Sequence, residues 1–355
     1  MLSVLTIGYR GLAIGYQGPP ALTFSRALGS WTLDPWTLAG LLVLGGGYVA
    51  GLRALRRRGM AWPGGRTFAF CGLGLGFTVL ATMSFVGVYQ PVLFYVRSVQ
   101  TILFLLVIPL FLALGRPLSL FIAAVPGAGQ RLAAAIKSPV ARLATFPVIT
   151  TLVLVITPFV VYFTPWYQAG FTSTAVAQVT HLAFTAPGFV FFWTLLRVDP
   201  VPKAYPYVVS LWITAAEVVG DAILGLSVVA SNSLLAGGYY HALARPWGPD
   251  LRTDQVLGGG VLWIFGDIVG LPFLAAQLIQ MIREDEADAA VIDAELDARD
   301  AAQAVAAAGN EAGDAAGTAA AASSGSPAGE RAAGPWWESD PRFAGRFQAV
   351  DEGEA

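Results

Sequence analysis

The sequence predicts an all-α integral membrane protein, a bundle of about seven transmembrane helices with a disordered C-terminal tail. Of its 355 residues, 55% are hydrophobic and only 12% are charged, whereas an ordinary soluble domain has roughly 25% charged residues. Long uncharged runs recur along the chain, and a bilayer core about 30 Å thick needs about 20 apolar residues in helical form. These two observations together indicate a polytopic membrane protein.

Seven apolar runs are long enough to cross a bilayer as helices. We predict transmembrane helices over residues 34–52, 66–86, 92–115, 143–163, 174–196, 206–229 and 257–282. The domain organisation that follows has three parts. They are an extracytoplasmic N-terminal segment, a seven-helix domain and an acidic cytoplasmic tail, at residues 1–33, 34–282 and 283–355.

The orientation follows from the positions of the basic residues. Arginines and lysines gather in the loops after the first, third and fifth predicted spans, at residues 53–58, 116–142 and 197–203. These loops share one side of an alternating topology, which the positive-inside rule places in the cytoplasm. Because arginines outnumber lysines nineteen to two, the composition favours a GC-rich bacterial source. We therefore expect a multi-pass protein of the bacterial plasma membrane, with its N-terminus outside and its C-terminus in the cytoplasm.

The N-terminal segment lacks the basic start, apolar core and cleavage site of a secretory signal, so we expect it to be retained. The membrane domain is basic, with sixteen Arg and Lys against seven Asp and Glu before position 283. Its charges lie in short loops rather than in one stripe, which argues against nucleic-acid binding and fits a lipid membrane.

The tail from position 283 onward carries sixteen acidic and five basic residues. Its first part, EDEADAAVIDAELDARDAAQAVAAAG, can extend the last helix, and the Ala, Gly and Ser residues that follow cannot build a core. We expect the tail to be mostly disordered. The terminal PWWESDPRFAGRF places aromatic residues among charges, and it is either a docking motif or a flexible end.

Beyond the first residues of the predicted spans, the charged and histidine side chains within them are Arg97, His181, Glu217, Asp221 and Asp267. Each such group disfavours membrane insertion by about 2.5 to 3.5 kcal/mol, so it is either paired or functional. Glu217 and Asp221 lie four residues apart on one helix face, where two ionised carboxylates would repel each other. A nearby cation or a proton is therefore required.

The sequence leaves two interpretations of this buried polar cluster open. In the first, Arg97 neutralises Asp221 or Asp267 and the group only holds helices together. In the second, the cluster is an outward-facing site that handles a metal ion or a proton. Imidazole and thioether groups suit copper. The candidate metal ligands are then His181, Met83 and His241.

We expect that the protein is not an enzyme. The sequence has no nucleophile elbow, no phosphate-binding glycine loop and no HExxH motif. Cys71 is its single cysteine, which excludes an intrachain disulfide and a thiolate metal cluster drawn from this chain alone.

The third span and the residues after it read RSVQTILFLLVIPLFLALGRPLSL. This segment resembles the CtaG family of cytochrome c oxidase assembly factors, seven-helix membrane proteins needed for an active oxidase with its copper centre. The likeness covers roughly residues 30 to 282. Further family landmarks are Asp34-Pro35, His181-Leu182, Asp254-Gln255, Gly258-Gly259 and Trp263. By this resemblance, Asp254 and Gln255 order the outer end of the last helix.

Three histidine-rich patterns of the family are altered in this chain. The family's HMVQH corresponds to residues 97–101, its WHxP to residues 162–165 and its HxxEH to residues 177–181. Only the last histidine of these patterns is kept, as His181. If those histidines bind copper in the family, this chain has lost most of the nitrogen donors while the helix-packing landmarks persist.

The resemblance implies an accessory or assembly factor for a haem-copper cytochrome c oxidase, with oxidase subunits or other assembly factors as partners. Copper centre formation is the associated chemistry, and copper is the candidate ligand. Two alternatives come from other classes. One is a copper or small-ion transporter that uses the buried carboxylates, although inverted repeats are not evident. The other is a membrane anchor whose acidic tail recruits a partner.

Overall fold

The computed structural model describes residues 16–203 and 205–320, and within these ranges the regular structure is entirely helical. Six of the described helical segments are long and apolar enough to cross a membrane, and a pair bent by 70° makes a seventh span if it is counted as one. The predicted polytopic all-α fold is confirmed. The chain divides into two compact units, one ending at Asp285 and the other beginning at Glu286.

The helices of the first unit follow one another through short connections. Two π-helical segments, Phe68–Gly74 and Leu103–Val107, join α3 to α4 and α6 to α7. The helices are α1 (Phe24–Gly29), α2 (Pro35–Arg57), α3 (Gly64–Thr67), α4 (Leu75–Met83), α5 (Phe85–Tyr89), α6 (Phe94–Ile102), α7 (Ile108–Leu114), α8 (Pro117–Ala124), α9 (Pro126–Ile136), α10 (Pro139–Ala144), α11 (Pro147–Phe163), α12 (Trp166–Thr172), α13 (Thr174–Leu196), α14 (Tyr207–Ala230), α15 (Gly237–Leu243) and α16, which begins at Leu251.

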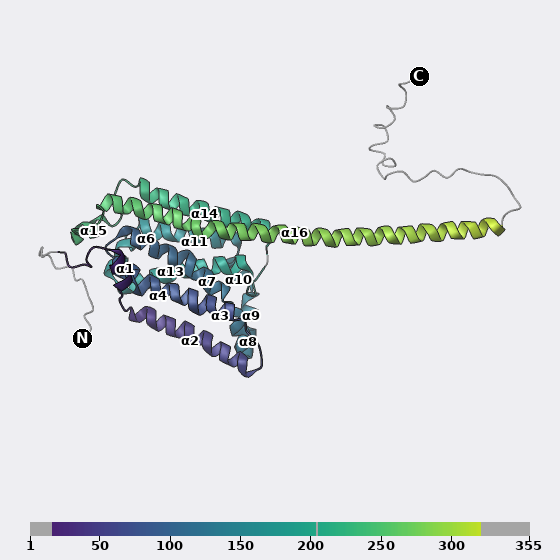
Figure 1. The fold of residues 1–355 in the computed structure, drawn as a ribbon, viewed down its shortest axis with the longest axis horizontal. Coiled ribbons are helices and arrows are strands. Elements are labelled where there is room, and N and C mark those ends of the chain that lie inside the picture. Colours follow the sequence, from purple (N-terminus) through teal and green to yellow (C-terminus); the bar gives the residue numbers. More distant parts are fainter. Residues whose placement is uncertain (1–15, 204, 321–355) are drawn as a thin grey trace, which may run out of the picture. The chain divides into compact units, whose positions relative to one another are not determined.

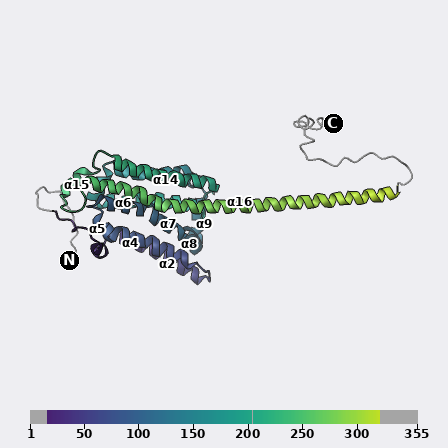
Figure 2. The same ribbon diagram turned by 45° about the horizontal axis from the view of Figure 1, so that its top comes forward.

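The long helices run side by side as a bundle, with α1 and α15 at one end and α8 and α9 at the other (Figures 1 and 2). We call these the α15 end and the α8 end. Proline occupies the first turn of α2, α8, α9, α10 and α11, where its missing N–H leaves no intrahelical bond unmade. The sequence therefore sets where these helices begin.

The segment formed by α6, the π-helical residues and α7 is the centre of the bundle. Ile102, Leu105 and Leu106 are almost fully buried. Gly188 of α13 lies directly against the backbone carbonyl of Leu105 and the ring of Pro109, where any side chain would collide. The close approach of α13 therefore depends on glycine at this position.

Asp34 caps α2 and joins it to α13. One carboxylate oxygen accepts hydrogen bonds from the backbone N–H groups of Trp36 and Thr37 at 3.0 and 3.3 Å. The other accepts from the Thr37 hydroxyl and from Nε2 of Gln178, both at 2.7 Å. Partial burial acts to raise the pKa of Asp34, but these hydrogen bonds outweigh it, so the pKa lies below its usual range.

We expect Asp34→Ala to lower the free energy of unfolding by about 1 kcal/mol, the usual effect of losing a helix cap. Because the folded pKa is depressed, the carboxylate contributes fully above the unfolded value of about 4 and loses its contribution as pH falls through the folded value. Asp34→Asn should therefore flatten the acid side of the stability profile. Thermal unfolding in detergent at a series of pH values measures both effects, and an unchanged acid limb in Asp34→Asn would contradict them.

The last helix continues well beyond the membrane-spanning length, since α16 extends from Leu251 to Ala320. Residues 284–309 are helical, in keeping with the expectation that this stretch can extend the last helix, and the helix continues through residues 310–320, where the sequence predicts disorder. Alanine has the highest helix propensity, and this segment is rich in it. In the second unit, side chains 286–303 are exposed, so propensity rather than packing supports the helix. Residues 1–15 and the terminal segment PWWESDPRFAGRF, interpreted as either a docking motif or a flexible end, lie outside the described residues.

Candidate functional site

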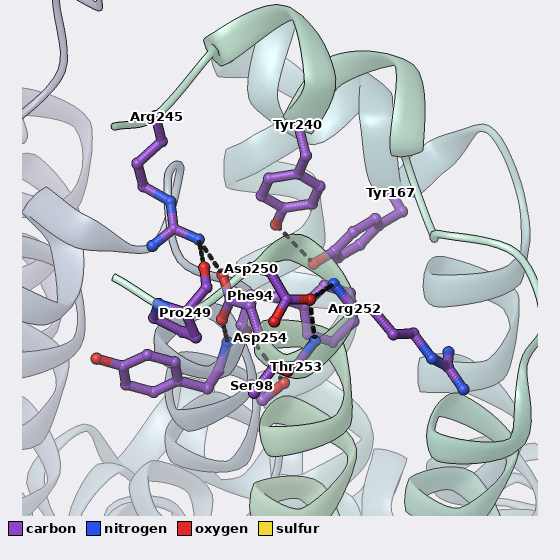
Figure 3. A network of polar contacts seen from close by, with 11 residues as sticks. Phe94, Ser98, Tyr167, Tyr240, Arg245, Pro249, Asp250, Arg252, Thr253 and Asp254 are labelled. Atoms are coloured by element: carbon purple, nitrogen blue, oxygen red, sulfur yellow. Dashed lines mark hydrogen bonds and ion pairs between the residues drawn. The ribbon is translucent and has the colours of Figure 1, made fainter. Parts of the chain in front are cut away.

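The α15 end of the bundle is tied together by a buried ion pair. Nη2 of Arg245 lies 3.0 Å from Oδ2 of Asp254, and their side chains are 3% and 1% exposed. The same nitrogen donates to the carbonyl of Pro249 at 2.9 Å. Oδ1 of Asp254 accepts from the backbone N–H of Tyr95 at 3.1 Å, so an acid of α16 caps the start of α6 (Figure 3).

Gln255, the neighbouring residue of α16, orders the connection between α14 and α15. Its Oε1 accepts from the backbone N–H of Leu235 at 2.8 Å. Its Nε2 donates to the carbonyls of Val228 and Ser233 at 3.3 and 3.2 Å. Of these two adjacent residues, Asp254 therefore holds Arg245 and the start of α6, and Gln255 holds the connection between α14 and α15.

Aromatic rings fill the space beneath this network. Phe94 lies against the rings of Tyr162, Tyr167 and Tyr240, with centroids 5.6 to 6.2 Å apart. The hydroxyls of Tyr167 and Tyr240 are 3.1 Å apart, so one donates to the other (Figure 3). Burial raises the pKa of Tyr240, so this hydroxyl stays neutral and hydrogen-bonded. These four residues form a buried aromatic cluster at the α15 end of the bundle.

Arg97 lies beside this aromatic cluster and is 3% exposed. Its Nη1 donates to Oε1 of Gln90 at 2.7 Å and to Oε1 of Gln100 at 3.0 Å. Its guanidinium lies 5.2 Å from the centroid of the Phe171 ring. Amide oxygens and the electron-rich ring face therefore stabilise the charge in place of a carboxylate.

The hypothesis that Arg97 neutralises Asp221 or Asp267 is wrong in this structure. The ion pair found among the described residues joins Arg245 to Asp254, and Arg97 donates to the two glutamines. The physical reason is local. Gln90 and Gln100 lie seven and three residues from Arg97 in the chain, so they satisfy it without reaching a distant helix.

The three predicted metal ligands lie in different surroundings. The ring of His181 stacks on Phe104 with centroids 4.3 Å apart, and its buried Nδ1 has no hydrogen-bond partner among the described residues. Met83 is buried at the end of α4, and its carbonyl accepts from the N–H of Thr32 at 2.8 Å. His241 is exposed on α15. Within the described ranges, no three His, Cys, Asp or Glu side chains form a group that could hold a metal ion.

The residues present do not fit a copper site of the type that the family histidines would make. Of the two histidines, His181 is partly buried on α13 and His241 is exposed on α15, and the charge of Arg97 acts on the His181 ring more strongly than that of Asp34. A guanidinium near an imidazole disfavours a further cation. The donor set and the local charge therefore both oppose copper binding here.

Glu217 and Asp221 form a second polar centre, on α14, where it packs against α16. They are 2% and 3% exposed. Oδ2 of Asp221 lies against Gly266, and Oε2 of Glu217 lies near Gly270. Asp267 follows Gly266 in the chain. One carboxylate oxygen of each acid is buried without a hydrogen-bond partner in the described part of the chain.

Sequence reasoning missed Arg245, Gln90 and Gln100 as partners of the buried charges. Arg245 had one available signal, because the loop at residues 230–256 combines basic and acidic residues with aromatics. The two glutamines had none, since an amide in an apolar helix does not indicate which charge it will meet.

The fold and these sites define a multi-pass helical membrane protein that holds polar groups inside its bundle. A family model described as cytochrome c oxidase caa3 assembly factor (Caa3_CtaG) matches residues 46–284. The chain belongs to this family, which confirms the resemblance inferred from the third span.

Related proteins are found in mycobacteria. Uncharacterized proteins of Mycobacterium bovis and Mycobacterium tuberculosis are each 29% identical to the chain over 305 residues, covering 81% of it and 46% of their own length. A protein of Mycobacterium leprae is 27% identical over the same length. The chain thus spans about half the length of these curated relatives. No solved structure matches the chain.

Proposed function

We propose that the chain is an accessory or assembly factor for a haem-copper cytochrome c oxidase in the bacterial plasma membrane. It acts by binding oxidase subunits or other assembly factors. Membership of the oxidase assembly family over residues 46–284 carries this proposal. The bundle supports a binding role because its buried polar groups are used mainly to hold helices and loops in place.

Residues in and beside the altered histidine-rich patterns support binding over copper delivery. The Thr101 hydroxyl lies 2.9 Å from the Tyr162 hydroxyl, and the indole N–H of Trp166 donates to Thr180 at 2.8 Å. These hydrogen bonds join α6 to α11 and α12 to α13, in and beside the patterns where the family has histidines. The chain keeps a scaffold at these positions, and a part in copper centre formation would come through its partners.

The orientation we propose places the α8 end in the cytoplasm and the α15 end outside. Basic loops meet at the α8 end, where Arg58 donates to the carbonyl of Ala123 at 2.8 Å. Asp199, from the loop after α13, accepts from the N–H groups of Leu118 and Ser119 at 3.1 and 2.9 Å. Clustered basic residues favour the cytoplasmic side of a membrane.

A deletion strain tests the proposed function. We expect it to make oxidase subunits that contain haem but to show reduced oxidase activity or a less stable complex. The full chain should restore both. A chain ending at residue 282 should also restore most of the activity, because the bundle and not the acidic tail is the active part.

Two outcomes would contradict this proposal. Normal oxidase activity and complex stability in the deletion strain would exclude an assembly role. Failure of the shortened chain alone, at normal abundance in the membrane, would favour an anchor that works through its tail. Copper uptake into proteoliposomes by the purified chain would favour the transporter alternative.

A further inference from the structure

The acidic centre on α14 and α16 has no role in the scaffold described above. Glu217, Asp221 and Asp267 lie where two helices pack closely, since Gly225 and Gly259 bring their backbones into contact. The three acids are close enough to interact electrostatically. A negative charge on Asp221 or Asp267 disfavours one on Glu217, and a charge on Asp267 disfavours one on Asp221. Among the described residues, none of these three acids forms an ion pair. Three ionised carboxylates in this position would repel one another in a medium of low dielectric constant.

In the described part of the chain, no basic residue of the surrounding helices forms an ion pair with these acids. Packed against α14, α11 has no acidic or basic residue, and Tyr162, its one titratable side chain, bonds Thr101. From Leu251 to Ile282, α16 holds Arg252, Asp254 and Asp267, and Arg252 donates to the carbonyls of Ser231 and Val229 at the α15 end. On α13 the titratable group is His181, which stacks on Phe104.

The geometry favours a proton over a metal ion as the neutralising species. Asp221 packs so closely against Gly266 that an added methyl group would collide with its carboxylate. These acids also do not form a group that could hold a metal ion, as no such group exists among the described His, Cys, Asp and Glu side chains. A proton needs only one carboxylate oxygen, and buried oxygens without partners are present on all three acids.

Polar side chains continue from this centre toward the α8 end of the bundle. The hydroxyl of Thr214, one turn from Glu217, donates to Oε1 of Gln277 on α16 at 3.1 Å. Gln277 is 3% exposed and its buried Nε2 has no partner in the described part of the chain. Nearer the helix start, Ser210 accepts from Nη2 of Arg197 at 3.2 Å. These polar side chains therefore lie between the acids and the basic end of the bundle.

We propose that Glu217, Asp221 and Asp267 form a proton-binding site inside the membrane, which exchanges protons with the cytoplasmic side along Thr214 and Gln277. The site lies on different helices from the Arg97 and aromatic cluster. Its proton-binding role does not depend on the oxidase role of the chain. The direction of exchange does depend on the orientation proposed above.

Infrared spectroscopy of the full chain in phosphatidylcholine vesicles tests this site. At neutral pH, exposed carboxyl groups are ionised because their pKa values are about 4. We expect the wild-type chain to retain a band of a protonated carboxylic acid, which shifts in heavy water. The band should be lost in Glu217→Gln/Asp221→Asn, whose amides match the carboxyl groups in size. It should be unchanged in Asp250→Asn, which alters an exposed acid at the α15 end.

Single substitutions keep the test decisive if the double variant does not fold. Glu217→Gln and Asp221→Asn, checked by circular dichroism, should each reduce or shift the band. Absence of the band in the wild-type chain, or its persistence in both single variants, would overturn the proposal. Thermal stabilisation of the wild-type chain by sodium, potassium or copper ions that disappears in these variants would also overturn it, because a metal ion would then be the occupant.

Discussion

Asp254→Ala should lower the free energy of unfolding by about 3 to 5 kcal/mol, the usual loss when one member of a buried ion pair is removed. The substitution leaves Arg245 as a buried charge without its partner, because both side chains are almost fully enclosed. It also removes the acceptor for the backbone N–H of Tyr95. One change therefore loosens the starts of α6 and α16 together.

Thermal or denaturant unfolding in detergent micelles measures this effect. Asp250→Ala is the matched control, since Asp250 lies four residues away and caps the same helix from an exposed position. Its loss should lower stability much less than the loss of Asp254, because it removes an exposed cap and leaves no buried charge unpaired. Arg245→Met/Asp254→Leu should be less damaging than Asp254→Ala, because an apolar pair leaves no unpaired charge. Equal effects of Asp254→Ala and Asp250→Ala would show that the buried pair is not formed.

Restoring two family histidines should create copper affinity. Residues 97, 101 and 104 share one face of the helix by their spacing, and Phe104 of this face stacks on His181. The change Arg97→His/Thr101→His removes a positive charge and adds two imidazoles on the side of the helix that meets the existing one. Imidazole nitrogen is a good copper donor, so we expect copper affinity to rise about tenfold or more, or about 1.4 kcal/mol.

Copper titration of the purified variant, compared with the wild-type chain, measures this gain. His181→Ala in the restored background should remove it. His241→Ala is the control, because His241 is exposed on α15 and should leave the gain intact. A wild-type chain that binds copper as tightly as the restored variant would contradict the interpretation of residues 97 and 101 as lost ligands.

The sequence was sufficient for the fold because length and polarity decide it. An apolar run of about 20 residues has few alternatives to a membrane-spanning helix. The bent pair α11 and α12 shows the limit of this reasoning, since a 70° break after Phe163 cannot be read from hydrophobicity. Residues 310–320 show another limit, because the helix continues through a stretch where the sequence predicts disorder.

The site was less predictable because its partners come from tertiary contacts. Buried charges could be found one by one from their positions in apolar segments. Their pairing could not, since Arg97 is satisfied by two glutamines while Arg245, from a loop, is the residue that meets an acid. Asp254 and Gln255 were found through family resemblance, and the structure gives their physical task, which is to fix α6 and the loop before α15.

Copurification most directly tests the central claim that the chain serves an oxidase by binding its partners rather than by carrying copper. The tagged full chain is isolated from its own membranes in mild detergent, and bound proteins and copper are both quantified. We predict that oxidase subunits or assembly factors copurify with it while copper stays well below one ion per chain. One copper ion per chain, lost on His181→Ala and found without any oxidase component, would contradict the account.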